Sequence, residues 1–180
     1  MGRKGDWEIK KWLDSDIKAA QLFNCICNVS QKDAMAYSGI SDNRIHTYLN
    51  LHYIEEHVDK RGNSYYRTTP EGRKMFEEKT GIYGYASNSY HHDKALYDVY
   101  VKLDEEERNS WQTEAEQRRY AEDHGYEIGE TSVCDGAYRD SETGEIHYVE
   151  IITKDYQQEW IDKKIAYVNI MGGTYERYDI

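Results

Sequence analysis

The sequence predicts an α+β protein made of two units, and three observations lead to this prediction. Residues 1–80 combine helix-capping signals with two short strand-like runs, and residues 91–180 alternate helical and strand-like segments. Residues 81–90 are rich in Gly, Ser, Asn and Tyr and carry no charge. Residues 1–80 hold 13 Lys and Arg against 12 Asp and Glu, whereas residues 81–180 hold 10 against 22. We therefore expect an N-terminal domain over 1–80, a linker over 81–90 and a C-terminal α/β domain over 91–180.

The composition argues against a membrane-spanning, an exported or a disulfide-rich protein. The chain has 180 residues and a formal net charge of −11. No apolar run approaches the roughly 20 residues that a membrane span needs, and the first ten residues lack the apolar core of a signal peptide. The three cysteines, Cys25, Cys27 and Cys134, do not form the pattern of a disulfide framework. We expect no membrane partner and a cytoplasmic location.

Capping signals predict three helices in the first unit. A first helix is expected over 14–28, where apolar residues follow helical spacing behind an acidic cap. A short helix over 30–39 opens at a capping box and stops at Gly39. Ser41 then caps a third helix that we expect to run to residue 54. Two short helices joined by a tight turn with a glycine are typical of a helix-turn-helix unit.

The residues that follow predict a β-hairpin and a fourth helix. Residues 58–68 read as a strand, a basic turn at Gly62 and a second strand, and Pro70 suits the first turn of a helix. The stretch 16–79 resembles the winged helix-turn-helix of bacterial regulators, in which the hairpin is the wing. The closing pattern of that family, Tyr-x-x-Thr-x-x-Gly-Arg, is matched here by Tyr66, Thr69, Gly72 and Arg73.

This resemblance implies double-stranded DNA as the partner. In such a unit the third helix enters the major groove and cations of the wing contact phosphates. The exposed face of the third helix is expected to carry the polar residues Asn43, Arg44, Thr47 and Asn50. Asn43 and Arg44 would be the base readers. The expected phosphate contacts are Lys60, Arg61 and Arg67. Duplex-binding domains usually carry a clear basic excess, which residues 1–80 lack, so the alternative is a winged helix that binds another protein.

The second unit is expected to mix helices and strands. Helices are predicted over 92–103 and 111–124, the latter capped by Ser110, with a charged break over 104–108 between them. Strands are then expected over 126–128, 132–139 and 146–153. A helix over 157–166 and two further strands over 167–171 and 174–178 are expected to follow.

This order of elements resembles the restriction-endonuclease-like core, which is known by its PD-(D/E)xK motif. Glu114 would lie in the leading helix, Asp135 inside the second strand and Glu150 in the third. The resemblance implies that Asp135 and Glu150 hold Mg²⁺ by hard oxygen ligands, while a lysine assists at the attacked phosphate.

The sequence departs from that motif at the lysine. Ile152 stands two residues after Glu150, where the motif has Lys. Lys154 would lie on the same strand face if the strand continues, and Lys163 or Lys164 could reach across from the next helix. The alternative is that the two carboxylates are structural and are satisfied by Arg, Lys or Tyr neighbours.

A narrower resemblance covers most of the chain. Its short motifs are His92 before an amphipathic helix, Trp111-Gln-Thr-Glu114, Cys134-Asp135-Gly136 and Val149-Glu150-Ile151. They resemble the replication-relaxation proteins of plasmids and conjugative elements, which also pair an N-terminal winged helix with a nuclease-like core. The resemblance implies a role in the replication or transfer of a mobile genetic element.

Three functional hypotheses follow. The first is a DNA-binding protein of a mobile element that acts in replication, transfer or transcriptional control, without a cofactor, and uses its acidic half for a homodimer or protein contact. The second is a DNA nickase or nuclease dependent on Mg²⁺, with Asp135, Glu150, Lys154 and Glu114 as its site residues. The third is an acidic inhibitor of a DNA-binding host enzyme. The charge of −12 on residues 81–180 favours the first, because an acidic surface repels phosphates.

Overall fold

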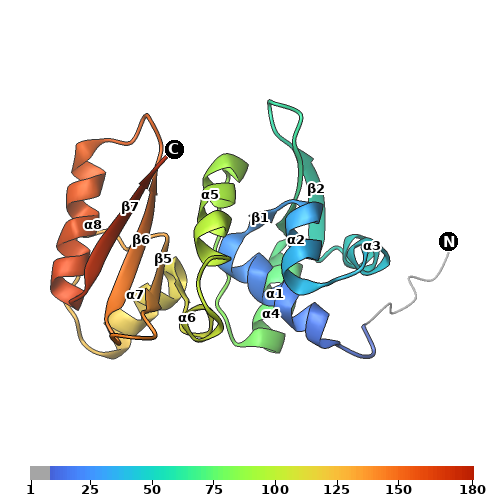
Figure 1. The fold of residues 1–180 in the computed structure, drawn as a ribbon, viewed down its shortest axis with the longest axis horizontal. Helices are drawn as coiled ribbons and strands as arrows, with labels where there is room; N and C mark the ends of the chain where they lie inside the picture. The colour runs from blue at the N-terminus through green and yellow to red at the C-terminus, as the bar shows by residue number, and fades with distance from the viewer. Residues whose placement is uncertain (1–8) are drawn as a thin grey trace.

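The computed structural model describes residues 9–180 as a mixed α+β protein (Figure 1). The elements of the N-terminal half are α1 (Asp14–Ile26), β1 (Asn28–Val29), α2 (Gln31–Ser38), α3 (Asp42–Asn50), β2 (Ile54–Val58), β3 (Ser64–Thr68) and α4 (Pro70–Thr80). The elements of the C-terminal half are α5 (Tyr90–Tyr100), α6 (Glu105–Asn109), β4 (Gln112–Thr113), α7 (Glu114–Asp123), β5 (Gly136–Arg139), β6 (Ile146–Ile152), α8 (Gln158–Met171) and β7 (Thr174–Asp179).

The N-terminal half packs its helices on a small antiparallel sheet with the strand order β1-β3-β2. The expected caps form, since the hydroxyls of Ser30, Ser41 and Thr69 each accept a hydrogen bond from a backbone amide in the first turn of α2, α3 and α4. Aromatic rings fill the core, where Phe76 of α4 stacks on Phe23 of α1 at a centroid distance of 6.0 Å. Ile54 of β2 and Tyr66 of β3 belong to the same hydrophobic cluster, which joins the hairpin to the helices.

The C-terminal half is built on a second sheet with the strand order β4-β5-β6-β7. Strands β4, β5 and β6 are antiparallel neighbours, and β7 runs parallel to β6. The chain reaches β7 through α8, whose Tyr167 and Val168 pack with Cys134, Ala137 and Tyr148 of the sheet side. This crossover leaves β7 at one edge of the sheet.

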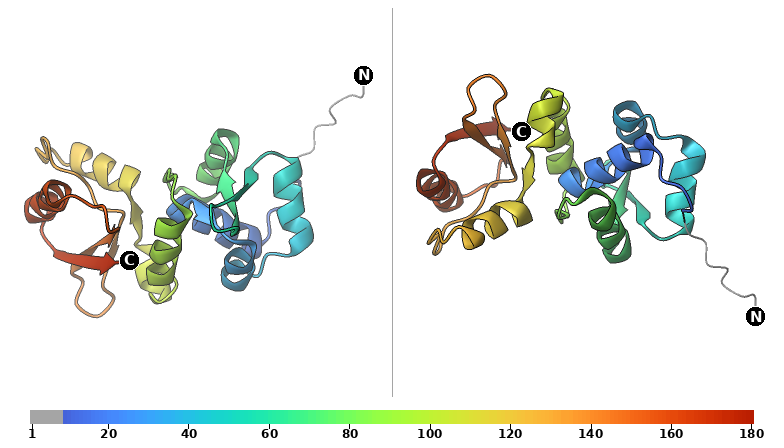
Figure 2. Two further views of the ribbon diagram at one scale, coloured as in Figure 1. Left: turned by 90° about the horizontal axis from the view of Figure 1, so that it is seen from above. Right: turned by 90° about the horizontal axis from the view of Figure 1, so that it is seen from below.

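Helix α5 lies between the two sheets in each of the views (Figures 1 and 2). It contacts α1 and β1 on one side and β6 on the other. A single hydrophobic cluster accordingly includes Phe23 of α1, Leu96 of α5 and Ile151 of β6. Helix α3 and the N-terminal end of α1 lie far from the second sheet (Figure 1).

Three expectations for strands in the second half are wrong. Residues 167–171 form the end of α8 and not a strand, because Ile161, Lys164 and Tyr167 recur on one buried face at helical spacing. Residues 126–128 form no strand, and β5 begins only at Gly136, so that Asp135 precedes the strand instead of lying inside it.

Several boundaries also differ from the expectations. Helix α3 ends at Asn50, since the next residues turn through a positive φ of 57° at His52 and lead into β2. Residues expected as a charged break form α6, which Asp104 caps. The cap of α7 is Thr113, not Ser110, because β4 intervenes. Within the described residues, no helix combines the length and the apolar character needed to cross a membrane.

Candidate functional site

The first candidate surface is the outer face of α3. Ile45 and Tyr48 are buried against the core, and this spacing leaves Asn43 and Asn50 exposed and Thr47 half-buried on the other side of the helix. A hollow of about 440 Å³ borders this face, and it is lined by Leu13, Ser15, Gly39, Ser41, Asn43, Arg44 and Thr47. The outer face of α3 therefore presents amide and hydroxyl groups next to a concave surface.

Arg44 also lines this hollow, but its guanidinium pairs with a buried carboxylate, so its predicted role as a base reader competes with a structural one. Its Nε and Nη2 lie 2.6 Å from the two carboxylate oxygens of Asp16, which is fully buried. Burial raises the pKa of Asp16, but the Arg44 guanidinium and the amide of Leu13 outweigh that effect and hold the pKa below its ordinary value. Arg44 is thus committed to neutralising a buried charge of α1.

The three hairpin cations that were predicted to contact phosphates differ in exposure. Lys60 and Arg61 are exposed at the turn and form no ion pair within the described residues. The turn is rigidified by Asp59, whose Oδ1 accepts hydrogen bonds from the amides of Arg61 and Asn63. Arg67 is half-buried instead, with its Nε donating to Asn28 Oδ1 at 2.8 Å. The predicted phosphate role of Arg67 therefore competes with a structural one.

The second candidate site lies where β5 and β6 meet. Asp135 and Glu150 converge there, since the amide of Asp135 donates to Glu150 Oε2 at 3.2 Å. Asp135 Oδ2 in turn accepts the amide of Ile151 at 2.8 Å. The exposed fractions are 7% for Asp135 and 1% for Glu150. Two carboxylates thus lie side by side beneath the surface, as the sequence spacing predicted.

Lys164 is the lysine of this cluster. Its Nζ lies 2.8 Å from Glu150 Oε2, and the hydroxyl of Tyr156 donates to Glu150 Oε1 at 2.6 Å. Burial, together with the charge of Asp135, raises the pKa of Glu150 above its ordinary value despite the lysine. Burial alone would lower the pKa of Lys164, but the two carboxylates raise it.

The other residues proposed for this site form no hydrogen bond or ion pair with Asp135 or Glu150 in the described structure. Strand β6 ends at Ile152, so Lys154 is exposed beyond the strand and does not share its face. Glu114 pairs with Arg118 one turn further along α7. Lys163 pairs with Glu159 at the surface. Of the alternatives for the missing lysine, only Lys164 contacts a carboxylate of the cluster.

His92 and Asp93 belong to the same cluster, although sequence reasoning gave them no role in it. His92 Nε2 lies 3.0 Å from Asp135 Oδ2, and its Nδ1 lies 3.1 Å from Asp93 Oδ1. Burial lowers the pKa of His92, but hydrogen bonds to these two carboxylates raise it to about 10. A His-Asp pair in the first turn of an amphipathic helix was the signal available in the sequence, but it does not reveal which acid lies opposite.

Asn28 extends the contacts into the first sheet. Its Nδ2 and its backbone amide donate to Asp93 Oδ2 at 2.7 and 3.1 Å. Since Arg67 donates to the other side of the Asn28 amide group, polar contacts run continuously from β3 to the second sheet. We call this series the polar chain; its members are Arg67, Asn28, Asp93, His92, Asp135, Glu150 and Lys164.

The donor set of the cluster suits Mg²⁺ only in part. Carboxylate oxygens are the ligands that Mg²⁺ prefers, and Asp135 Oδ1 has no hydrogen-bond partner among the described residues. Both oxygens of Glu150 already accept hydrogen bonds, however. No group of three or more His, Cys, Asp or Glu side chains in residues 9–180 is arranged as a metal site. Mg²⁺ held by both acids would share the oxygens of Glu150 with Lys164 and Tyr156, through lone pairs that these hydrogen bonds leave free.

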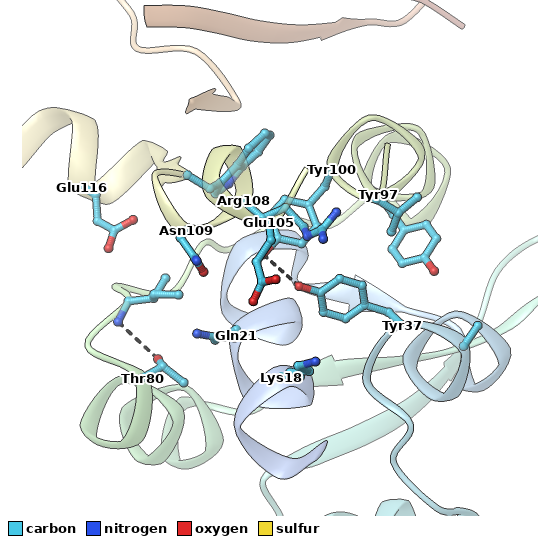
Figure 3. A pocket seen from close by; sticks show the side chains of 14 residues that line it. Lys18, Gln21, Tyr37, Thr80, Tyr97, Tyr100, Glu105, Arg108, Asn109 and Glu116 are labelled. Carbon is cyan, nitrogen blue, oxygen red and sulfur yellow. Dashed lines mark hydrogen bonds between the residues drawn. The ribbon is translucent and has the colours of Figure 1, made fainter. Parts of the chain in front are cut away.

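A cavity of about 540 Å³ lies apart from both sites, between the N-terminal helices and α5 to α7 (Figure 3). Its lining combines the cations Lys18 and Arg108 with the carboxylates Glu105 and Glu116. Glu116 is already engaged by the amides of Thr113 and Tyr83. The mixture of charges does not single out one chemistry of ligand.

Comparisons of the chain with protein-family models, with curated proteins and with solved structures find no match.

Proposed function

We propose that the protein binds double-stranded DNA through an N-terminal winged helix made of α1 to α4 and the first sheet, and that it controls replication, transfer or transcription of a mobile genetic element in the cytoplasm. The observation that carries the proposal is the exposed polar face of α3, together with a hairpin whose turn presents Lys60 and Arg61. A helix of this kind fits the major groove, and a hairpin beside it meets the backbone.

The residue types suit these roles. A side-chain amide can make two hydrogen bonds to adenine in the major groove, and such a pair discriminates against the wrong base by roughly 1–3 kcal/mol. Asn43 and Asn50 offer such amides, whereas Arg44 is held by Asp16. Lys60 and Arg61 would contact phosphates without reading sequence.

The distribution of charge supports the same face. The second sheet and its helices belong to the half with a net charge of −12, and α3 lies at the opposite end of the molecule (Figure 1). DNA on α3 would avoid most of the repulsion from the acidic half. That acidic half as a surface for a homodimer or a protein partner stays a prediction.

Binding to a random-sequence duplex, followed by fluorescence anisotropy at several salt concentrations, tests the proposal. Loss of two phosphate contacts in the Lys60→Ala/Arg61→Ala variant should weaken binding and reduce the slope of log K against log salt by roughly 2. Asn43→Ala/Asn50→Ala should leave that slope unchanged but relax the sequence preference selected from the pool.

The matched control removes the same charge elsewhere. Lys102→Ala/Arg139→Ala changes two exposed cations of the acidic half that form no ion pair in the described structure. It should bind like the wild type. An equal loss in both double variants, or no binding by the wild type at low salt, would contradict a DNA interface on α3 and the hairpin.

A second candidate function is hydrolysis of a DNA phosphodiester bond, and the contact between Lys164 and Glu150 favours it. Asp135 and Glu150 would hold Mg²⁺, which when bound supplies an activated water molecule. Lys164 would place its charge near the attacked phosphate, as the lysine of the PD-(D/E)xK motif is expected to do. The succession of β5, β6, α8 and a parallel β7 supports this hypothesis.

Nicking of a supercoiled plasmid with Mg²⁺ or Mn²⁺ separates this function from a structural role of the cluster. Cleavage by the wild type should be lost in Glu150→Gln and in Lys164→Met, but kept in Lys163→Met, which changes the neighbouring surface lysine. Absence of cleavage by the folded wild type would favour the interpretation in which Lys164 and Tyr156 simply satisfy a structural carboxylate.

A further inference from the structure

The first turn of α5 contacts both the first sheet, which includes the β2–β3 hairpin, and the carboxylate cluster of Asp135 and Glu150. Tyr90, His92 and Asp93 all belong to this turn. Tyr90 and Asp93 contact the first sheet, while His92 contacts the second. The turn is therefore held from both sides.

On the hairpin side, two independent contacts attach the turn. The ring of Tyr90 stacks on Tyr65 of β3 with a centroid distance of 4.7 Å and an interplanar angle of 7°. Asp93 is fully buried and accepts both hydrogen bonds from Asn28, which also holds Arg67 of β3. A displacement of β3 would disturb the ring stack and the partners of a buried carboxylate together.

On the other side, His92 reaches Asp135, and Asp135 contacts the end of the ladder between β5 and β6. The pairing of β5 with β6 stops at Gly136 and Val149. Beyond that point the amide of Ile151 is bound not by a β5 backbone oxygen but by Asp135 Oδ2. The amide of Ile151 therefore reports whether the Asp135 side chain stays in place.

We propose that the first turn of α5 is a positioning element that couples DNA contact at the hairpin to the Asp135 side chain through Tyr90, Asp93 and His92. The inference rests on DNA binding by the hairpin, as proposed above. DNA that fixes β3 also fixes Asp93 and His92, because breaking their contacts would leave buried polar groups without partners. His92 and Asp93 act here through Asp135 and are positioning residues, not catalytic ones.

Hydrogen exchange of single amides, measured by NMR on the whole protein with and without a random-sequence duplex at low salt, tests the coupling. In the wild type, DNA should slow exchange of the Ile151 amide about fivefold or more relative to that of Val168 in α8, the range of a typical coupling between sites. Val168 is buried away from the polar chain and corrects for overall stabilisation by the bound duplex.

His92→Gln should abolish the extra slowing at Ile151 while protection of the hairpin amides and the affinity for DNA remain. The matched control is His91→Gln, since His91 is exposed and forms no hydrogen bond in the described structure. It should behave like the wild type. If His92→Gln does not fold, Tyr90→Leu removes the ring stack, leaves the buried charges paired and should also reduce the slowing.

The outcomes separate the inference from the function on which it rests. Protection of the hairpin by DNA without extra slowing at Ile151 would overturn the coupling and leave DNA binding intact. Slowing that persists in both variants would overturn the role of this turn. Absence of any binding or hairpin protection would instead overturn the proposed DNA interface.

Discussion

Asp16 and Glu150 are buried carboxylates, and each is paired with a cation from a different element of the fold. Arg44 of α3 neutralises Asp16 of α1, and Lys164 of α8 neutralises Glu150 of β6. A buried charge that loses its partner is strongly destabilising, whereas replacing both partners with neutral groups often is not. Arg44 and Lys164 therefore each stabilise a buried carboxylate, in addition to any part that they take in DNA binding or catalysis.

Arg44→Met should therefore destabilise the fold by about 3–5 kcal/mol, because it leaves Asp16 buried without a counter-charge. The double variant Asp16→Asn/Arg44→Met should recover most of that loss. Urea denaturation followed by circular dichroism measures both. Arg61→Ala, at an exposed side chain that has no partner among residues 9–180, should stay within about 0.5 kcal/mol of the wild type. A small effect of Arg44→Met would mean that Arg44 is free for recognition after all.

His92 predicts a dependence of stability on pH. The folded protein holds the His92 proton up to a pKa of about 10, whereas the unfolded chain releases it near 6.5. Between these values the folded state binds more protons, so the stabilisation from His92 is complete below pH 6.5 and is lost as the pH rises toward 10. Denaturant titrations should show a decline over this window that is steeper for the wild type than for His92→Gln. Parallel pH curves would contradict the shifted pKa.

At some contacts between elements, the neighbouring atoms lie so close that only a glycine fits. Helix α4 begins against the turn before β2, and a Cβ atom added at Gly72 would lie 1.8 Å from the backbone oxygen of Tyr53. A Cβ atom at Gly84 would instead meet side-chain carbons of Arg73, the nearest of which is Cγ at 2.3 Å. Backbone cannot yield without moving an element, whereas a side chain can change rotamer.

Gly72→Ala should consequently destabilise the protein by about 1–3 kcal/mol or more, as overpacking of a tight contact does, and Gly84→Ala by clearly less. Thermal unfolding of the two variants in parallel provides the measurement. Equal midpoints for the two variants would show that α4 can shift away from the turn without loss of stability.

The molecule as a whole joins two differently charged halves through one hydrophobic cluster. Residues of α1, α5 and β6 contribute to it, and α5 lies between the sheets (Figure 1). The polar chain crosses the same boundary. Shared burial of this kind makes the free energies of the two halves interdependent, even though the sequence divides them by composition.

Calorimetry of the whole chain should therefore show one cooperative unfolding transition. Leu96 of α5 is fully buried, so Leu96→Ala should cost about 2–5 kcal/mol and lower the temperature of that single transition. A transition that splits in two, with one part unchanged by the variant, would mean that the halves unfold independently.

Much of the fold was predictable because its signals are local. The caps Ser30, Ser41 and Thr69 and the turn of the β2–β3 hairpin depend on hydrogen bonds within a few residues. Local signals failed at residues 167–171, where an apolar run fits either a strand or a buried helix. Only packing against the second sheet decided for the helix.

The candidate sites divide in the same way. The sequence by itself determined which acids, amides and cations the chain offers, and that Asp135 and Glu150 belong to neighbouring segments. The tertiary structure alone decided that Arg44 faces Asp16 across 28 residues of chain, His92 faces Asp135 across 43, and Lys164, not Lys154, reaches Glu150. The physical reason is that a buried charge takes whichever counter-charge the packing of distant elements brings within hydrogen-bond distance, and no spacing along the chain encodes that choice.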